Sequence, residues 1–303
     1  MELSSRKVKG KKQKAERGGS PFCLCGCFVA TEPSAFCLSA YLLCLPIYCL
    51  LRVFGWTSLM QVMTFVIPIV LCAFSFAHAV ESRGLKLAVL LFASGAVISL
   101  GAELLGTATG LLFGHYTYTE RMGYKLFGLV PWLIPVAWCG MLYPAWCVAE
   151  FVMRSAYTVS QSYNLTHYAL RITLSALALT AWDLSLDPRM VQDGNWVWQG
   201  GGAYFGVPLS NYMGWVVTAL GVYFVWGRLE IGYWQLAIKP TRYPIANSQY
   251  LAVWAYIVVW LGESVANVLF WAGPWVGLCV FVGMGLFALP ALWKLNLRGS
   301  RTL

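Results

Sequence analysis

Two aspartates, Asp183 and Asp187, stand four residues apart in the sequence Thr-Ala-Trp-Asp-Leu-Ser-Leu-Asp-Pro-Arg-Met, at the end of an apolar stretch of membrane length. Side chains spaced i and i+4 share one face of a helix. Ionisable groups inside a membrane are costly, so such a pair is a candidate for function. A structural alternative stays open, because Asp187 precedes Pro188, which can end the helix where the chain leaves the bilayer.

The composition predicts the kind of fold that must position this pair. Of the 303 residues, 59% are hydrophobic and 11% are charged, and the mean hydropathy is +0.65. About a quarter of the residues are charged in typical soluble domains. We therefore expect an all-α, polytopic transmembrane helical bundle, with residues 1–34 as a basic, cysteine-rich tail and residues 35–303 as one domain.

Eight apolar stretches are long enough to cross about 30 Å of hydrocarbon. The first of them is interrupted by Pro46, and without it the bundle would have seven spans. The predicted spans are Ala35–Leu51, Leu59–Val80, Leu85–Leu105, Val130–Met153, Tyr168–Leu186, Val207–Leu229, Tyr250–Phe270 and Trp275–Trp293.

The positive residues indicate topology. The net charge is +9, and seven of the 21 Lys and Arg residues lie in the first 17 residues. If that tail is cytoplasmic, ten more fall on the same side of the membrane and four on the other, as the positive-inside rule requires. We therefore expect both termini in the cytoplasm of a bacterial cell whose cytoplasmic membrane holds the protein, and no nucleic-acid partner.

The cysteines do not indicate a disulfide framework or a metal site. Most of the ten stand singly in apolar stretches, where cysteine behaves as a small hydrophobic residue. Cys23, Cys25 and Cys27 cluster in the tail, but their spacing fits no common zinc pattern and no histidine lies nearby.

With this topology, several polar side chains fall in one leaflet. Glu103 lies near the outer end of the third span, His115 follows in an outer loop, and Glu263 lies in the outer half of the seventh span, on the same side as the aspartate pair. The two long outer connectors mix aromatic residues with glycines, so we expect them to fold back onto the bundle. An aromatic belt at the water interface is the alternative.

Carboxyl groups in aromatic, apolar surroundings suggest acid catalysis. Burial disfavours the charged form of a carboxyl group, and so does a second carboxylate beside it. One member of a pair can therefore remain protonated and act as a general acid. An apolar polyene substrate offers mainly carbon–carbon double bonds, whose protonation gives a tertiary cation that aromatic faces stabilise. Trapping by water would complete a cofactor-independent hydration.

Three ordered blocks carry a family resemblance. The first block is the aspartate segment with the glycine-rich run from Trp196 to Trp215. The second is Tyr-Thr-Tyr-Thr at 116–119 with Leu126–Pro135, and the third is Met-Leu-Tyr-Pro-Ala at 141–145. Together they resemble CruF-type carotenoid biosynthesis proteins, the carotenoid 1′,2′-hydratases. The resemblance implies addition of water to the acyclic ψ-end of a carotenoid such as γ-carotene or lycopene. It also marks Asp183, Asp187, Tyr204, Asn211 and Trp215 as motif positions.

Our hypothesis for the site makes Asp183 or Asp187 the proton donor, with Glu103 or His115 positioning water. Asn211 either orients a carboxylate or water, or packs between helices. The residues expected to bind substrate are Tyr116, Tyr118, Trp182, Trp198, Tyr204, Asn211 and Trp215. Carotenoid, water and membrane lipid are the expected partners, with other enzymes of the carotenoid pathway as further candidates.

Two other functions stay open at this point. A membrane polyprenyl transferase could use Asp183 and Asp187 to hold Mg²⁺ against a diphosphate, although the outer face offers few further acidic or basic residues; full activity in EDTA would exclude it. A carotenoid or lipid carrier would use the same aromatic cavity without a proton donor. Formation of a product heavier by one water would exclude a pure carrier.

Overall fold

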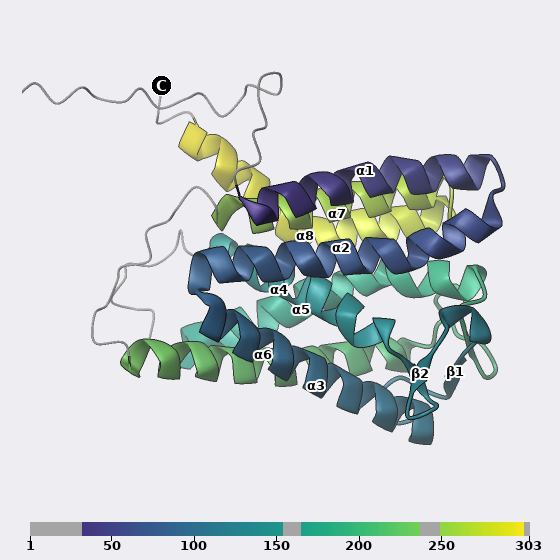
Figure 1. The fold of residues 1–303 in the computed structure, drawn as a ribbon, viewed down its shortest axis with the longest axis horizontal. Helices are drawn as coiled ribbons and strands as arrows, with labels where there is room; N and C mark the ends of the chain where they lie inside the picture. Colours follow the sequence, from purple (N-terminus) through teal and green to yellow (C-terminus); the bar gives the residue numbers. More distant parts are fainter. Residues whose placement is uncertain (1–31, 154–164, 237–248, 300–303) are drawn as a thin grey trace, which may run out of the picture.

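A computed structural model describes residues 32–153, 165–236 and 249–299 of the chain, so almost all of the predicted cysteine-rich tail lies outside the described residues. The all-α bundle is confirmed (Figure 1). In the described ranges the α-helices are α1 (Pro33–Val53), α2 (Thr57–Arg83), α3 (Leu85–Thr109), α4 (Leu133–Met153), α5 (Leu165–Gln192), α6 (Leu209–Leu236), α7 (Gln249–Leu269) and α8 (Pro274–Gly299).

Within those ranges, seven helices are long and apolar enough to cross a membrane. The first predicted span, α1, is among them in spite of Pro46. The helix that falls short is α6, which carries Asn211, Arg228 and Glu230 besides many aromatic residues. It packs against α3 and α5, so burial against its neighbours stabilises a helix that is less apolar than the rest.

The helix α5 continues past Pro188 to Gln192, so the proline does not end it. Proline lacks the N–H that would bond to the carbonyl four residues earlier, which here belongs to Leu184. The hydroxyl of Tyr204 donates to that carbonyl oxygen at 3.0 Å. This bond replaces the missing helical one and lets α5 hold Asp183 and Asp187 on one continuous face.

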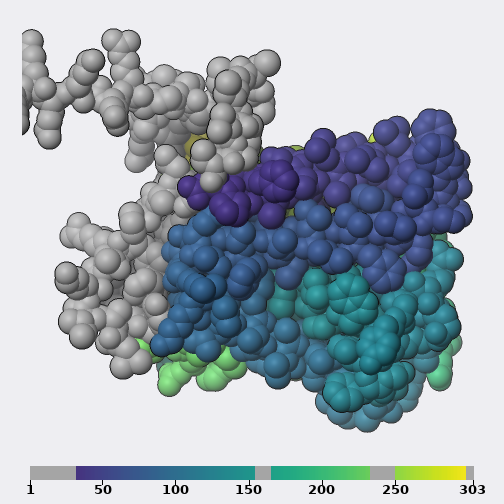
Figure 2. Space-filling model, viewed as in Figure 1, coloured from purple at the N-terminus to yellow at the C-terminus, as the bar shows by residue number. Residues whose placement is uncertain are grey.

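The long connectors after α3 and α5 fold back onto the bundle as expected. The strand β1 (Tyr116–Tyr118) of the first pairs antiparallel with β4 (Trp196–Trp198) of the second, with Tyr116 opposite Trp198. A smaller hairpin joins β2 (Lys125–Leu126) to β3 (Val130–Pro131). These sheets lie at the end of the bundle opposite to the start of α1 and the end of α8 (Figure 1). In the space-filling view the teal connector after α3 covers that end (Figure 2).

A close backbone approach joins the first connector to α6. A Cβ added to Gly214 would lie 2.7 Å from the carbonyl carbon of Leu112, a backbone atom in a turn where Leu112 has a φ of 71°. Only glycine therefore lets α6 pack against this turn.

We expect Gly214→Ala to destabilise the protein by roughly 1–3 kcal/mol, the usual cost of inserting a methyl group into a packed interface. Thermal unfolding in detergent measures the effect. Gly221→Ala is the matched control, because no atom lies within 4 Å of a Cβ added at that lipid-facing position of the same helix. Equal melting temperatures for the two variants would contradict the close approach.

Candidate active site

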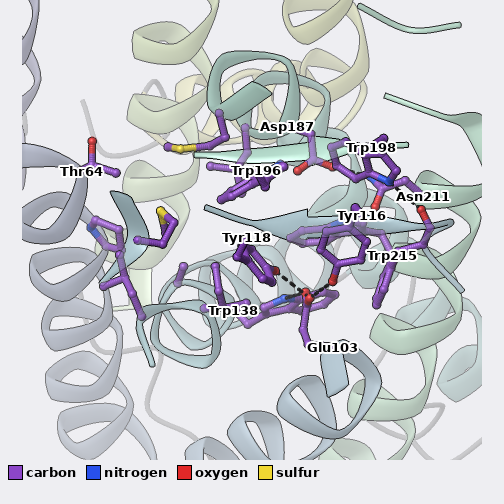
Figure 3. A pocket seen from close by; sticks show the side chains of 18 residues that line it. Thr64, Glu103, Tyr116, Tyr118, Trp138, Asp187, Trp196, Trp198, Asn211 and Trp215 are labelled. Carbon is purple, nitrogen blue, oxygen red and sulfur yellow. Dashed lines mark hydrogen bonds between the residues drawn. The ribbon is translucent and has the colours of Figure 1, made fainter. Parts of the chain in front are cut away.

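A cavity lies beneath the β1–β4 sheet, between helices α2 to α6 (Figure 3). We call it the aromatic cavity. Its empty volume, including the part open to the outside, is about 570 Å³. The lining residues are Thr64, Pro68, Glu103, Phe113, Tyr116, Tyr118, Met122, Leu133, Ile134, Ala137, Trp138, Leu186, Asp187, Met190, Trp196, Trp198, Asn211 and Trp215.

The alternation of side chains along the two strands supplies the aromatic roof. Tyr116 and Tyr118 of β1, like Trp196 and Trp198 of β4, are buried and line the cavity, whereas the residue between each pair is exposed. Tyr116 stacks on Trp198 with ring centroids 5.3 Å apart, and Tyr118 meets Trp196 edge-on at 5.5 Å. Cross-strand pairing thus joins residues 78 and 82 positions apart into one surface.

Glu103 of α3 is buried beneath this roof and accepts three hydrogen bonds. The hydroxyl of Tyr116 donates to Oε2, as does that of Tyr118 at 2.8 Å. The indole N–H of Trp138 donates to Oε1 at 3.0 Å. Since an ionised carboxylate only accepts hydrogen bonds, this arrangement of three donors suits the charged form of Glu103.

The two tyrosines remain donors at physiological pH. Burial raises the pKa of both phenols well above its ordinary value, and the neighbouring Glu103 carboxylate raises it further. In Figure 3 the hydroxyls of both point toward Glu103, and Asp187 lies on the other side of the Tyr116 ring.

The aspartate pair shares a single amide donor. Asp183 is fully buried and Asp187 is 3% exposed. The side-chain amide of Asn211, from α6, donates to Oδ2 of Asp183 at 3.0 Å and to Oδ2 of Asp187. Asp187 lines the aromatic cavity and Asp183 lies one turn behind it. Oδ1 of Asp183 finds no hydrogen-bond partner in the described part of the chain. One proton shared between the two carboxyl groups would satisfy this arrangement.

Stacked indoles join the two acidic regions. The rings of Trp138 and Trp215 are nearly parallel, with centroids 3.9 Å apart. Trp182 meets Trp215 edge-on at 6.2 Å and belongs to the layer behind the lining. The wall between Glu103 and the aspartate pair is therefore a continuous aromatic surface.

Two candidate residues lie away from this arrangement. His115 is exposed; it directly precedes Tyr116, so the alternation along β1 turns it away from the cavity, against the expectation that it joins the carboxylates. Tyr204 is half-buried and outside the lining, where it bonds to Leu184 and meets Tyr212 edge-on at 5.4 Å. It supports α5 instead of facing the cavity.

Glu263 also departs from the expected convergence. Its Oε2 accepts a hydrogen bond from Ser185 at 2.6 Å and lies 3.6 Å from Arg189. The guanidinium of Arg189 stacks 4.4 Å from the ring centroid of Trp271. Since Glu263 and its partners do not line the aromatic cavity, this buried ion pair joins α5 to α7 as a separate network.

Two residues that line the cavity, Trp196 and Trp138, are not among those predicted from the sequence. The sequence Trp-Val-Trp carries the alternation that would have placed Trp196 beside Trp198. Trp138 stands within an apolar span, and no local pattern distinguishes its indole N–H as the third donor to Glu103.

The fold and site define an integral membrane protein with a buried acidic, aromatic cavity suited to an apolar ligand. Residues 60–287 match the model of a family described as carotenoid biosynthesis protein, and the chain belongs to this family. A bisanhydrobacterioruberin hydratase from Haloarcula japonica is 32% identical over 157 residues. That alignment covers 51% of this chain and 48% of the relative, so the chain matches about half of the relative's length. No solved structure matches the chain.

The shared amide generates a prediction about stability. We expect Asn211→Ala to lower the unfolding free energy by about 1.5–3 kcal/mol, because hydrogen bonds to charged groups have this value and two buried carboxyl groups lose their donor. Thermal unfolding in detergent is the measurement, with Met213→Ala, a lipid-exposed position on the same helix, as control.

Adding Asp183→Asn to Asn211→Ala should recover part of the lost stability, because the new amide can donate to Asp187. A double-mutant cycle with no coupling between positions 183 and 211 would contradict the shared hydrogen bond.

Proposed function

We propose that this protein is a carotenoid hydratase that adds water across the terminal 1′,2′ double bond of an acyclic ψ end group, as in γ-carotene or lycopene. Family membership and the resemblance to a relative named as a hydratase support the substrate class and reaction. The observation that carries the proposal is Asp187, which belongs to a buried carboxyl pair and lines an aromatic cavity that also contains Glu103.

In the first step the carboxyl group of Asp187 protonates C2′ of the alkene. The O–H bond breaks, a C–H bond forms from the π electrons, and the positive charge develops at the tertiary carbon C1′. Asp183 shares the proton with Asp187 before transfer, and Asn211 stabilises the carboxylate that remains.

The cavity stabilises the cation in two ways. Each aromatic face of Tyr116, Trp198 or Trp215 that meets the cation contributes about 0.5–2 kcal/mol. The Glu103 carboxylate, held by its three donors, adds an electrostatic attraction that is strong where water is excluded.

In the second step water attacks C1′ and forms the C–O bond. Glu103 orients this water and accepts one of its protons, and proton return to the aspartate pair restores the starting state. The net change is the addition of one water, with no oxidation or reduction and no cofactor. Exposed His115, the other candidate for positioning water, is left out of this scheme because of its place outside the cavity.

We expect Asp187→Asn to lower hydration by about 10²–10⁴-fold, the usual contribution of a positioned proton donor. Asp183→Asn and Glu103→Gln should lower it too, since each removes a carboxyl group that shares or accepts the proton. Product formation is measured by liquid chromatography with mass detection, after expression in cells that produce lycopene or γ-carotene.

Glu120→Gln is the matched control for these variants. It makes the same change of carboxylate to amide at a side chain that is 93% exposed and pairs with Lys125. Full activity of both Asp187→Asn and Asp183→Asn would refute the proposed proton donor.

A further inference from the structure

A second cavity, which we call the polar cavity, lies beside the aromatic one. It is formed where α1 ends, where α2 begins and where the chain leaves α5, and its empty volume, including the part open to the outside, is about 660 Å³. Its lining residues are Tyr48, Arg52, Gly55, Thr57, Met60, Gln61, Thr64, Arg121, Asp193 and Asn195. Thr64 of α2 lines both cavities.

The polar cavity is lined by two guanidinium groups, one carboxylate and several neutral polar groups. Arg52 bonds to Asp193 at 2.9 Å, and the hydroxyl of Tyr48 donates to the same carboxylate at 3.3 Å. Arg121 donates to the side-chain oxygen of Gln61 at 2.9 Å, and the Gln61 amide donates back to the Arg121 carbonyl oxygen at 2.8 Å. These charged and amide groups offer hydrogen-bond partners to water in this space.

One unpartnered acceptor lies at the boundary. Asn195 is fully buried and lines the polar cavity, and in the described ranges its Oδ1 accepts no hydrogen bond. Its backbone is held by Met190 and Thr119, and its side-chain amide donates to the sulfur of Met190 at 3.1 Å. Met190 lines the aromatic cavity, and so does Trp196, the residue that follows Asn195. Asn195 thus holds a fixed, buried acceptor between the polar cavity and the aromatic wall.

A hydration needs one water molecule at the cation and little other water in the cavity. The aromatic cavity is lined mostly by buried apolar side chains, among which free water would weaken the electrostatic stabilisation of the cation. The reactant water must therefore enter at a defined place, and Thr64 is the residue that the linings of the two cavities share.

We propose that the polar cavity is the water-binding site that supplies the reaction, with Thr64 and Asn195 as positioning residues at its junction with the aromatic cavity. This inference rests on the proposed hydratase function. Protonation of the alkene and delivery of water are then separable steps: blocking the junction leaves the first and removes the second.

The separation can be measured because a cation that meets no water loses a proton to a carboxylate and returns to an alkene. In D₂O a deuteron from the carboxyl group forms a C–D bond, and loss of a neighbouring proton then leaves deuterium in the recovered carotenoid. Purified enzyme equilibrated in D₂O and in excess over substrate gives a single turnover. Mass detection then follows both the alcohol and the labelled alkene.

We expect Thr64→Leu, which fills the junction, to lower alcohol formation by roughly 10²-fold, the effect of misplacing a reacting group. Deuterium in the recovered alkene should persist or rise. Thr64→Ser should retain hydration, and Val62→Leu, at a lipid-exposed position of the same helix, is the matched control. Thr64→Val, which keeps the side-chain shape, should show the same change in product ratio to a smaller extent and serves if Thr64→Leu does not fold.

An unchanged ratio of alcohol to labelled alkene in a folded Thr64 variant would overturn the inference, whether both products persist or both fall together. A wild-type protein that forms neither product would instead overturn the proposed function, and the water site with it.

Discussion

Carboxyl groups buried in an apolar helix bundle must find their hydrogen-bond donors within the protein, and this constraint determines how the helices meet. Glu103 of α3 takes its donors from β1 and from α4. The aspartate pair of α5 takes its donor from Asn211 of α6. A shift of any one of these elements would leave a buried acceptor unsatisfied, so the site's polar contacts also hold this end of the bundle together.

The two long connectors supply the aromatic side chains that cover the acidic groups of the helices. The strand β1 brings the tyrosines to Glu103, and its pairing with β4 places two tryptophans over Asp187. Tyr204, on the same connector as β4, bonds to the carbonyl that Pro188 leaves free and so keeps α5 helical through the aspartate pair. The same two connectors therefore build the aromatic roof and support the helix that carries the aspartate pair.

Much of this arrangement is readable from the sequence where the signal is local. Span length and hydropathy predict the bundle, the i,i+4 spacing predicts that Asp183 and Asp187 share a face, and the mixed aromatic and glycine composition predicts that the connectors fold back. The resemblance to a known family points to Asn211, although it does not say that one amide bridges both carboxyl groups.

The rest depends on contacts between distant segments. His115 and Tyr116 are neighbours in the chain, but the register of β1 with β4 decides which of them faces the cavity. Glu263 is predicted to lie in the same leaflet as the other acids, yet its pairing with Arg189 separates it from them. Trp138 becomes a donor to Glu103 only through the packing of α3 against α4. Leaflet and composition cannot distinguish these outcomes, because each is determined by tertiary packing.

The central claim is that a buried carboxyl group protonates a carotenoid alkene and that water completes the reaction. The most direct test is incubation of the purified protein with γ-carotene in water enriched in heavy oxygen, followed by mass detection. We expect a single carotenoid alcohol whose new hydroxyl carries the heavy oxygen. Recovery of unchanged γ-carotene bound to the protein, or a product whose oxygen does not come from water, would contradict the claim.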